Sequence, residues 1–352
     1  MIFSKKLITW YLQNKRSMPW RETKNPYHIW LSEIILQQTR VAQGLPYYIS
    51  FTETFSTVFD LANASEEEVL KLWQGLGYYS RARNLHATAK YVANDLNGVF
   101  PTSYKGLLHL KGVGDYTASA IASICYAEAV PVVDGNVYRV LSRYFGLDTP
   151  INSAKGVKEF KELAITLMDH DEPAEYNQAI MEFGALQCKP KKPYCIICPL
   201  RDSCEALKNG KIEELPVKIK KLKIKKRYFN YLVFFTENKK TIIQQRVGSG
   251  IWKGLYEFPL IESETINTDT IASHSVFREM IKDKEYEIVS YQEEPIVHKL
   301  SHQHLYTRFY IIKSDAPSKV NHDQKIVDYE EIHTYPVPIL LGNFIDVFFQ
   351  KN

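Results

Sequence analysis

The 352-residue sequence contains no run of about 18 or more uncharged apolar residues, the length that a membrane-spanning helix requires. Its first residues lead directly into an amphipathic helical pattern and do not form the regions of a signal peptide. We therefore expect a cytoplasmic protein with no membrane partner. Cysteine is scarce, with 5 residues, and in a reducing compartment such thiols are more often metal ligands than disulfides.

A strong excess of either charge is also missing. The formal net charge is +4, and 45% of the residues are hydrophobic and 24% charged, which is the composition of a soluble globular protein. This mild positive charge permits nucleic-acid binding but indicates it only if the basic residues cluster. A chain of this length is expected to form two domains.

The first part of the chain, residues 1–215, has apolar residues at helical spacing that are interrupted by proline and glycine, and it is predicted to be all-α. Residues 216–227 are rich in lysine and are predicted to form a basic linker that leads into a strand. A solvated linker and a segment that contacts phosphates are both compatible with this composition.

The second part, residues 228–352, is predicted to be α+β. Runs of aromatic and β-branched residues at 228–235 and 305–312 indicate strands. One segment between them, residues 275–282, has a helical pattern.

Four cysteines are spaced as C-x6-C-x2-C-x5-C, at Cys188, Cys195, Cys198 and Cys204. Four thiolates this close predict a metal site, and a [4Fe–4S] cluster needs four such ligands. Zinc is the alternative, but structural zinc usually binds two separate C-x2-C pairs, and only one is present. The spacing therefore favours iron–sulfur. The fifth residue, Cys125, is predicted to be a small buried apolar side chain.

The loop between the first two of these cysteines carries three lysines, Lys189, Lys191 and Lys192. A loop anchored at both ends by cluster ligands would hold these cations in place for a nucleic-acid backbone. Solubility is the other explanation for the same lysines.

A glycine-containing turn joins two helical patterns at Gly112, Val113 and Gly114. Glycines permit a tight turn that exposes backbone N–H groups at the start of the second helix, where the helix dipole also favours a phosphate. Taken alone the turn could be an ordinary interhelical connection. The downstream cysteines make phosphate binding the better interpretation.

Two carboxylates lie in contrasting surroundings. Glu33 is flanked by apolar residues at helical spacing, and desolvation would raise its pKa so that it could act as an acid. Asp134 follows an apolar run at an expected helix start, where the helix dipole should keep it ionised. Such a pair could supply the acid and the stabilising anion of a glycoside-type cleavage. A paired core acid and a simple helix cap are the alternatives.

The order of the hairpin, Val-Asp-Gly-Asn-Val at 133–137 and the four cysteines resembles the helix–hairpin–helix DNA glycosylase superfamily. Within it, Ser-Glu-Ile-Ile-Leu-Gln-Gln-Thr-Arg-Val at 32–41 and the segment 73–85 resemble the signatures of the MutY-type adenine glycosylases. In the second part, residues 252–259 and 300–302 resemble that family's recognition domain, which has the fold of the Nudix nucleotide pyrophosphatases.

The resemblance implies a multi-domain fold. An all-α catalytic domain at 1–215 would contain a six-helix barrel at about 25–130, and the remainder with the N-terminal helix would carry the [4Fe–4S] cluster at 188–204. The linker at 216–227 would lead to a Nudix-like 8-oxoguanine recognition domain at 228–352.

The resemblance also implies a base excision repair enzyme that flips adenine out of duplex DNA and hydrolyses its N-glycosidic bond, where adenine faces 8-oxoguanine or guanine. Glu33 would protonate N7 of adenine and help to activate water. Asp134 would stabilise the oxocarbenium-like sugar, supported by Tyr116 and Asn136. The expected partner is duplex DNA with such mispairs, bound by a monomer at the nucleoid.

Further positions match residues of the family that contact the substrate. Gln38 and Tyr78 match residues that wedge into the base stack. Leu300, Ser301 and His302 match the loop that reads the oxidised base. The adenine pocket is matched by Arg16, Trp20, Arg21, Leu36 and Gln178.

Three departures qualify the resemblance. Superfamily members that also break the strand carry a lysine where this chain has Tyr116, so we expect a monofunctional glycosylase, although Lys111 lies nearby. Leu300 stands where the family often has phenylalanine, so apolar contact there would differ. Tyr256 replaces a more usual tryptophan.

Three other functions remain open at this stage. A nucleotide pyrophosphatase would need a helix with clustered acids, which residues 278–283 lack. A DNA-binding redox sensor would use the cluster without catalysis. A sibling glycosylase for thymine or oxidised pyrimidines would generally lack the second domain.

Overall fold

The computed structural model describes residues 2–219, 224–282, 284–314 and 321–349. The contacts divide the chain into two compact units, one formed by Met1–Asn63 with Asn84–Lys221 and the other by Ala64–Arg83 with Leu222–Asn352. In the described ranges no helix combines the length and the apolar character that crossing a bilayer requires. Part of the predicted basic linker, residues 220–223, lies outside the described residues.

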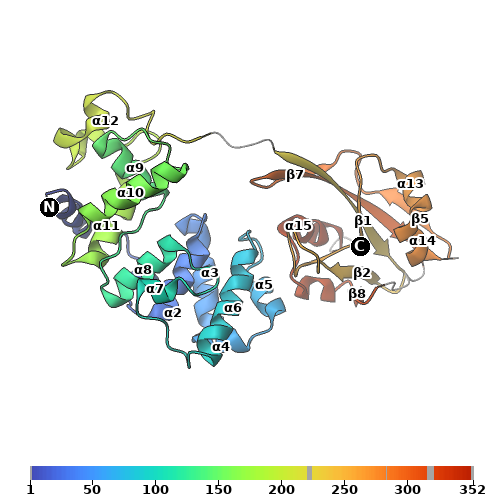
Figure 1. Cartoon of the computed structure of the whole chain (residues 1–352). Helices are drawn as coiled ribbons and strands as arrows, with labels where there is room; N and C mark the ends of the chain where they lie inside the picture. The colour runs from blue at the N-terminus through green and yellow to red at the C-terminus, as the bar shows by residue number, and fades with distance from the viewer. Residues whose placement is uncertain (1, 220–223, 283, 315–320, 350–352) are drawn as a thin grey trace. The chain divides into compact units, whose positions relative to one another are not determined.

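The first unit is helical, as predicted (Figure 1). Helix α6 begins in the second unit and continues into the first. The elements of the first unit in chain order are α1 (Ile2–Asn14), η1 (Pro19–Arg21), α2 (Pro26–Leu36), α3 (Val41–Thr54), α4 (Val58–Asn63), α6 (Ser80–Asn94), α7 (Tyr104–Leu107), α8 (Asp115–Tyr126), α9 (Gly135–Phe145), α10 (Ala154–Leu167), α11 (Pro173–Leu186), η2 (Cys195–Ile197), η3 (Arg201–Ser203) and α12 (Glu205–Lys208).

Helix α2 carries Glu33 through the core of the first unit. Its start is encoded locally, because the Asn25 side chain accepts a hydrogen bond from the Tyr27 N–H at 2.9 Å and Pro26 occupies the first turn. Most of its side chains are buried, including Trp30 and Ile34. This burial places Glu33 on a helix whose position is fixed on nearly every side.

Helix α11 packs against α1, α8 and α9, and so lies at the centre of the helices that follow the hairpin (Figure 1). The close approach to α9 depends on Gly184, because a Cβ there would lie 2.6 Å from the Cβ of Asn136. Glycine at this position therefore brings α11 against the start of α9.

The hairpin between α7 and α8 is closed by a tight turn. Gly112 has φ +82°, and an added Cβ would lie 2.8 Å from the Cβ of Asn84, so this position requires glycine for two reasons. Gly114 is the N-cap of α8. The interhelical hairpin predicted from the G-x-G pattern is thus present.

The second unit contains two sheets with helices, which confirms the predicted α+β class. Within the described residues one sheet has the strand order β4-β1-β7-β5, with β6 also paired to β7, and the other has the order β3-β2-β8. The elements of the second unit are α5 (Glu66–Leu72), β1 (Lys225–Phe235), β2 (Lys240–Gln245), β3 (Tyr256–Glu257), β4 (Leu260–Glu262), α13 (Thr268–Ser273), α14 (Ser275–Ile281), β5 (Glu287–Ser290), β6 (Ile296–Lys299), β7 (Gln303–Lys313), β8 (Gln324–Asp328), η4 (Glu331–Thr334) and α15 (Ile339–Phe348).

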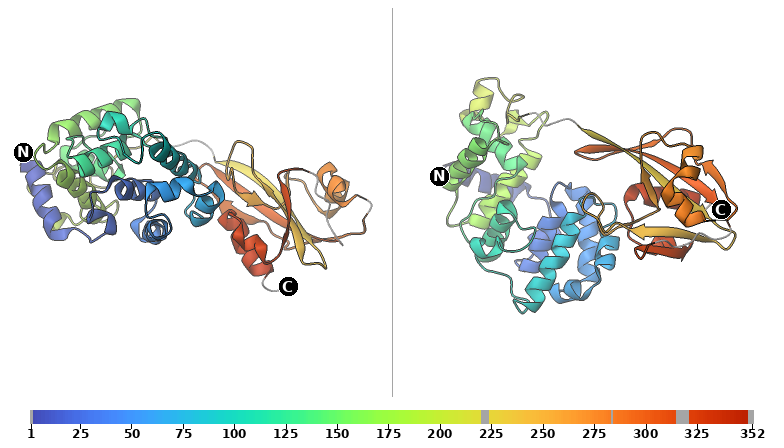
Figure 2. Two further views of the ribbon diagram at one scale, coloured as in Figure 1. Left: turned by 90° about the horizontal axis from the view of Figure 1, so that it is seen from below. Right: turned by 45° about the vertical axis from the view of Figure 1, so that its right-hand side comes forward.

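The long strands β1 and β7 run side by side and parallel (Figure 2), with Lys225 opposite Gln303 and Phe235 opposite Lys313. One face of this pair packs its alternate apolar residues, such as Leu232 and Ile312, against α13 and α14. Both strands were predicted. Strand β1 begins at Lys225, so the last residues of the predicted linker are strand residues.

Residues 64–83, which include α5, contact the connections between strands of the second unit. The Lys71 ammonium donates to the Tyr335 carbonyl at 3.2 Å, and the Arg83 guanidinium donates to the Lys253 carbonyl at 2.6 Å. A Cβ on Gly254 would lie 3.1 Å from Leu70. The turn after α5 carries Tyr78, whose hydroxyl is hydrogen-bonded to Ser301 in the loop between β6 and β7.

Candidate active site

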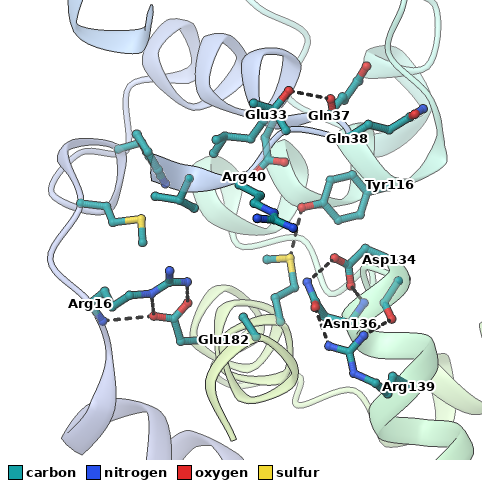
Figure 3. A pocket seen from close by; sticks show the side chains of 18 of the residues that line it. Arg16, Glu33, Gln37, Gln38, Arg40, Tyr116, Asp134, Asn136, Arg139 and Glu182 are labelled. Carbon is teal, nitrogen blue, oxygen red and sulfur yellow. Dashed lines mark hydrogen bonds and ion pairs between the residues drawn. The ribbon is translucent and has the colours of Figure 1, made fainter. Parts of the chain in front are cut away.

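A cavity of about 920 Å³ in the first unit brings together residues from distant parts of the chain (Figure 3). Both predicted catalytic carboxylates, Glu33 and Asp134, line it together with Tyr116 and Asn136. Of the predicted adenine-pocket residues, Arg16, Trp20, Arg21 and Leu36 also line it, and so does Gln38.

Glu33 projects from α2 into this cavity and is only partly exposed. Burial raises the pKa of Glu33 to about 7, although a hydrogen bond from Tyr116 opposes the shift and the charge of Asp134 adds to it. The carboxyl can therefore carry a proton near neutral pH. This is the direction expected from its apolar neighbours in the sequence.

Asp134 is the N-cap of α9. Its Oδ1 accepts hydrogen bonds from the backbone N–H groups of Asn136 and Val137, each at 2.8 Å, and its Oδ2 accepts one from the Asn136 side chain at 2.8 Å. These bonds favour the anion, but burial outweighs them and raises the pKa of Asp134 above its usual value. The helix start thus favours the ionised form, as expected, while burial acts in the opposite direction.

Tyr116 connects the two sides of the cavity. Its hydroxyl donates to Met181 Sδ at 3.1 Å, and its hydrogen-bonding interaction with Glu33 lowers the pKa of that carboxyl. Burial raises the pKa of Tyr116 well above its usual value, so its hydroxyl remains protonated and acts as a donor. A lysine at this position would offer an amine for a covalent imine, which the phenol cannot form.

Arg139 was not identified from the sequence, and it links the Asp134 side of the cavity to the first cysteine. Its Nη2 donates to Asn136 Oδ1 at 2.8 Å and to the Gly184 carbonyl at 2.6 Å. Its Nε donates to the Cys188 carbonyl at 2.7 Å. Arg139 therefore orients the amide that bonds to Asp134 (Figure 3).

Glu182 is a second residue that the sequence analysis missed. Its carboxylate lies on α11, is 2% exposed, and binds Arg16 and Arg21, with Nη2–Oε2 distances of 2.6 and 2.8 Å. These two arginines lower the pKa of Glu182 to about 2 in spite of its burial. An acid on a mostly apolar helix gave no signal in the sequence that distinguished it from a solvated residue.

Gln178 does not line the cavity that contains Glu33. It lines a second cavity of about 340 Å³, whose wall also includes Arg16, Met18 and Arg21. The Gln178 Oε1 accepts a hydrogen bond from the Tyr11 hydroxyl at 2.7 Å. The two cavities thus share the loop between α1 and η1 as a common wall.

The four predicted cluster ligands, Cys188, Cys195, Cys198 and Cys204, line one small cavity. Burial, with a smaller effect from the charges of neighbouring cysteines, raises the pKa of Cys195 and Cys204, and it raises the pKa of Cys198 to about 11. In the described part of the chain no three His, Cys, Asp or Glu side chains are arranged to hold a single metal ion. Four thiols around one cavity are a donor set that suits a [4Fe–4S] cluster, which takes four cysteine ligands.

The loop after Cys188 is anchored by a buried arginine. Arg143 donates to the carbonyls of Lys189 at 2.7 Å and Pro190 at 3.2 Å, and its Nη1 lies 3.5 Å from the Cys188 Sγ. The Lys189 ammonium lies against the Tyr194 ring and donates to its hydroxyl at 2.8 Å. Lys191 and Lys192, by contrast, are exposed.

The three predicted hairpin residues differ in what they can offer a phosphate. The Val113 side chain is buried and its N–H donates to the Leu110 carbonyl at 3.1 Å. The amides of Gly112 and Gly114 donate to no acceptor in the part of the chain that the structure describes. Two of the three expected backbone donors are therefore available.

A cavity of about 580 Å³ in the second unit is lined by Tyr78, Leu300, Ser301 and His302. The structure thus brings together the predicted wedge tyrosine and the predicted recognition loop. The Tyr78 hydroxyl and the Ser301 hydroxyl are hydrogen-bond partners. Trp252, the first residue of the segment 252–259 that resembles the recognition domain, lines the same cavity with φ +62°.

Both predicted wedge residues have a left-handed backbone conformation, with φ +55° at Gln38 and +49° at Tyr78. Side-chain-bearing residues rarely adopt this conformation, and such residues cluster at functional sites. Near Tyr78, the buried Arg81 donates to the Gly77 carbonyl at 3.1 Å and lies 5.0 Å from the Trp73 ring. These contacts hold the turn in its strained form.

Comparison with known proteins defines the class first. Residues 31–164 match the family of HhH-GPD superfamily base excision DNA repair proteins, and residues 230–346 match the NUDIX domain. A solved thermostable thymine-DNA glycosylase is 31% identical with a TM-score of 0.55, covering 59% of this chain and 96% of that one. An endonuclease III–DNA complex with 21% identity and a TM-score of 0.52 shares the fold over 59% of this chain and 95% of that one.

Relatives found by sequence similarity narrow this class. The adenine DNA glycosylase of Buchnera aphidicola subsp. Baizongia pistaciae is 35% identical over 308 residues, which cover 87% of this chain and 84% of the relative. The human adenine DNA glycosylase is 42% identical over 222 residues, which cover 60% of this chain and 41% of the relative. The chain belongs to the adenine DNA glycosylase family and is a DNA glycosylase of base excision repair.

Proposed function

We propose that the protein binds duplex DNA and hydrolyses the N-glycosidic bond of adenine that faces 8-oxoguanine or guanine. The observation that carries this proposal is the pair of carboxyls in one cavity, because Glu33, with a pKa of about 7, can hold a proton while Asp134 accepts three hydrogen bonds. Base release needs a proton on the leaving base and a negative charge beside the developing sugar cation.

Glu33 supplies the proton. Adenine flipped into the cavity would place N7 at the Glu33 carboxyl, and protonation makes the base a better leaving group. The bond between C1′ and N9 then breaks with its electron pair moving to the base. The Tyr116 hydroxyl stabilises the Glu33 carboxylate that remains, and this carboxylate can accept a proton from the attacking water.

Asp134 stabilises the sugar. Three donated hydrogen bonds fix its two oxygens, so a fixed negative charge faces the oxocarbenium-like sugar without reorganisation. Asn136 supplies two of these bonds and is itself held by Arg139. Because Tyr116 replaces the lysine of strand-cleaving members, base release is the only chemical step of the proposal.

The cysteine site would hold a [4Fe–4S] cluster through Cys188, Cys195, Cys198 and Cys204, and the cluster would supply structural cross-linking of this segment. The exposed Lys191 and Lys192 beside it, with the free amides of Gly112 and Gly114, would contact the DNA backbone. Action on chromosomal DNA would place a monomer in the cytoplasm at the nucleoid.

The second unit would read the base opposite adenine. Ser301 and His302 are exposed at the rim of a cavity that Tyr78 also lines, where a hydroxyl and an imidazole can bond to an oxidised purine edge. The pyrophosphatase alternative is not favoured. Helix α14 carries Glu279 as its one acid, whereas pyrophosphatase chemistry needs a helix with clustered acids.

The test is an end-labelled duplex with one adenine opposite 8-oxoguanine, incubated with the iron-loaded protein and then divided between samples with and without hot alkali. We expect strand breakage only after alkali, and none with Glu33→Gln, which should still bind the duplex. Breakage without alkali would contradict the monofunctional assignment. No breakage in either sample from wild-type protein would overturn the proposed function.

A further inference from the structure

Glu182 lines the cavity that contains Glu33, and the proposed chemistry gives it no role. The residue is 2% exposed and carries a full charge, which is costly unless partners compensate it. Figure 3 shows its carboxylate facing Arg16 across the lower edge of the cavity. A buried charge at this position therefore suggests a role in the site.

The geometry of this clamp is specific. Glu182 Oε1 accepts from Arg16 Nε at 2.8 Å and from the Arg16 backbone N–H at 3.1 Å, and Oε2 accepts from Arg16 Nη2 at 2.6 Å. Arg21 donates to the same two oxygens at 3.0 and 2.8 Å and to the Arg16 carbonyl at 2.9 Å. The loop from Arg16 to Arg21 is therefore tied to α11 through one carboxylate.

The clamp occupies only one edge of the Arg16 guanidinium. Within the described residues, Nη1 of Arg16 has no hydrogen-bond partner, and this side chain is 39% exposed. Arg16 lines both the cavity with Glu33 and the second cavity. A guanidinium held along its Nε–Nη2 edge can present its remaining N–H groups to a ligand with little loss of conformational entropy.

We propose that Glu182 is a positioning residue that presents Arg16 Nη1 to a ring nitrogen of the base in the cavity, and so helps to set which base is released. The inference rests on the proposed function. Adenine offers N1, N3 and N7 as acceptors, and the proposed chemistry reserves N7 for Glu33. Arg16 would therefore donate to N1 or N3, and would be unable to do so from a loop that Glu182 no longer holds.

The test uses single-turnover base release from duplexes in which adenine, 1-deazaadenine or 3-deazaadenine faces 8-oxoguanine. In the wild-type protein, the analogue that lacks the contacted nitrogen should be released about tenfold more slowly than adenine. This tenfold ratio is counted after division by the adenine-to-analogue ratio of the variants, which reports losses unrelated to the contact. Arg16→Ala should remove this discrimination, and Glu182→Gln should remove it equally. Glu175→Gln, which removes an exposed charge from the same helix beside the second cavity, should keep it.

Adenine release itself gives a second comparison. Glu182→Gln should slow it by about 10- to 100-fold, since small misplacements of a positioning group have effects of this size. The double variant with Arg16→Ala should be no slower than Glu182→Gln alone, because Glu182 acts through Arg16. If Glu182→Gln does not fold, Glu182→Asp tests the same prediction. It keeps the charge but withdraws the carboxylate by one methylene, so it should weaken the discrimination.

A pH profile separates positioning from simple packing. The charged and titratable groups that face Glu33 are Tyr116 and Cys125 from α8, Asp134 before α9 and Arg21 from η1. Without Glu182 the charge of Arg21 is less compensated, so Glu33 should lose its proton at lower pH. The fall in rate with rising pH should then move down by about one unit in Glu182→Gln and stay in place in Glu182→Asp.

The outcomes separate a failure of the proposed function from a failure of the role proposed for Glu182. A wild-type protein that releases no adenine defeats the proposed function. A wild-type protein that releases adenine but treats both deaza analogues as Arg16→Ala does overturns only this inference. So does a folded Glu182→Gln that keeps the wild-type discrimination and pH profile, or additive losses in the double variant.

Discussion

The cavity of the first unit and the cavity of the second unit are built on different principles. Around Glu33 and Asp134 the functional side chains are partly or fully buried, and Asp134 accepts three hydrogen bonds while Glu33 has one, from Tyr116. Around Ser301 and His302 the side chains are exposed, and the Tyr78 side chain is 44% exposed. The first arrangement shifts the pKa values of its carboxyls, whereas the second leaves its side chains accessible to a binding partner.

Three buried carboxyls in the first unit show how partners decide the outcome of burial. Glu33, with one hydrogen bond from Tyr116, has its pKa raised to about 7. Asp134, with three hydrogen bonds, also has its pKa raised by burial. Glu182, between two arginines, has its pKa lowered to about 2. Desolvation acts on all three, and it is outweighed only at Glu182, where two arginines bond directly to the carboxylate.

The largest effect that we predict concerns the first cavity. Asp134→Asn should reduce base release by about 1000-fold or more, because the charge that faces the sugar is lost. Asparagine caps helices about as well as aspartate, so the melting temperature should change little. Single-turnover kinetics and thermal melting measure the two properties. Retained turnover would remove Asp134 from the mechanism. If the variant is strongly destabilised, its slow turnover could not be attributed to the lost charge.

The next prediction asks whether the cysteine cavity supports the first unit. Cys198→Ser should lower the iron content and the visible absorption of the purified protein, and should reduce duplex affinity by about tenfold because the lysine loop loses its anchor. Cys125→Ser, at the one cysteine that does not line this cavity, is the matched control and should leave the iron content unaltered. Unchanged iron in Cys198→Ser would contradict the ligand assignment.

A smaller and different effect is expected in the second cavity. Ser301→Ala should reduce the preference for 8-oxoguanine over guanine by about tenfold, the value of one hydrogen bond to a base edge, and should leave the rate of adenine release at saturating enzyme unchanged. Ser290→Ala, an exposed serine of β5, is the control. A fall in the release rate without a change in preference would assign Ser301 to catalysis and erase the contrast between the cavities.

The smallest effect is predicted at the hairpin. Gly112→Ala combines an unfavourable φ with a clash against Asn84, and it should weaken duplex affinity by about threefold to tenfold. Gly210→Ala shares the positive φ, +68°, but its Cβ would meet nothing within 4 Å. Equal losses of affinity in both variants would show that backbone strain alone matters and that the hairpin does not contact DNA.

Much of this organisation could be predicted from the sequence because it is local. The G-x-G hairpin, the apolar setting of Glu33, the cap at Asp134 and the cysteine spacing are each contained in a short segment. Features that depend on distant segments could not be predicted, and the clamp of Arg16 by Glu182, 166 residues apart, is the clearest example. Gln178 was assigned to the adenine pocket by resemblance, but it faces a neighbouring cavity because Tyr11 holds it there.

The second unit was predicted less completely for a physical reason. Strands β1 and β7 carry long apolar runs, whereas β3 and β4 are too short to show any alternation. Helix α13 and helix α15 were also missed. The C-terminal helix is apolar on most sides, so its pattern does not distinguish a buried helix from a strand.

The central claim is that a buried, protonated Glu33 drives base release, and the pH dependence of the single-turnover rate at saturating enzyme tests it most directly. Because burial raises the pKa of Glu33 to about 7, the proton is present below this pH and lost above it. The rate should therefore fall about tenfold for each unit above about pH 7.5, while duplex binding persists. A rate that stays level from about pH 6 to about pH 8.5 would contradict the account.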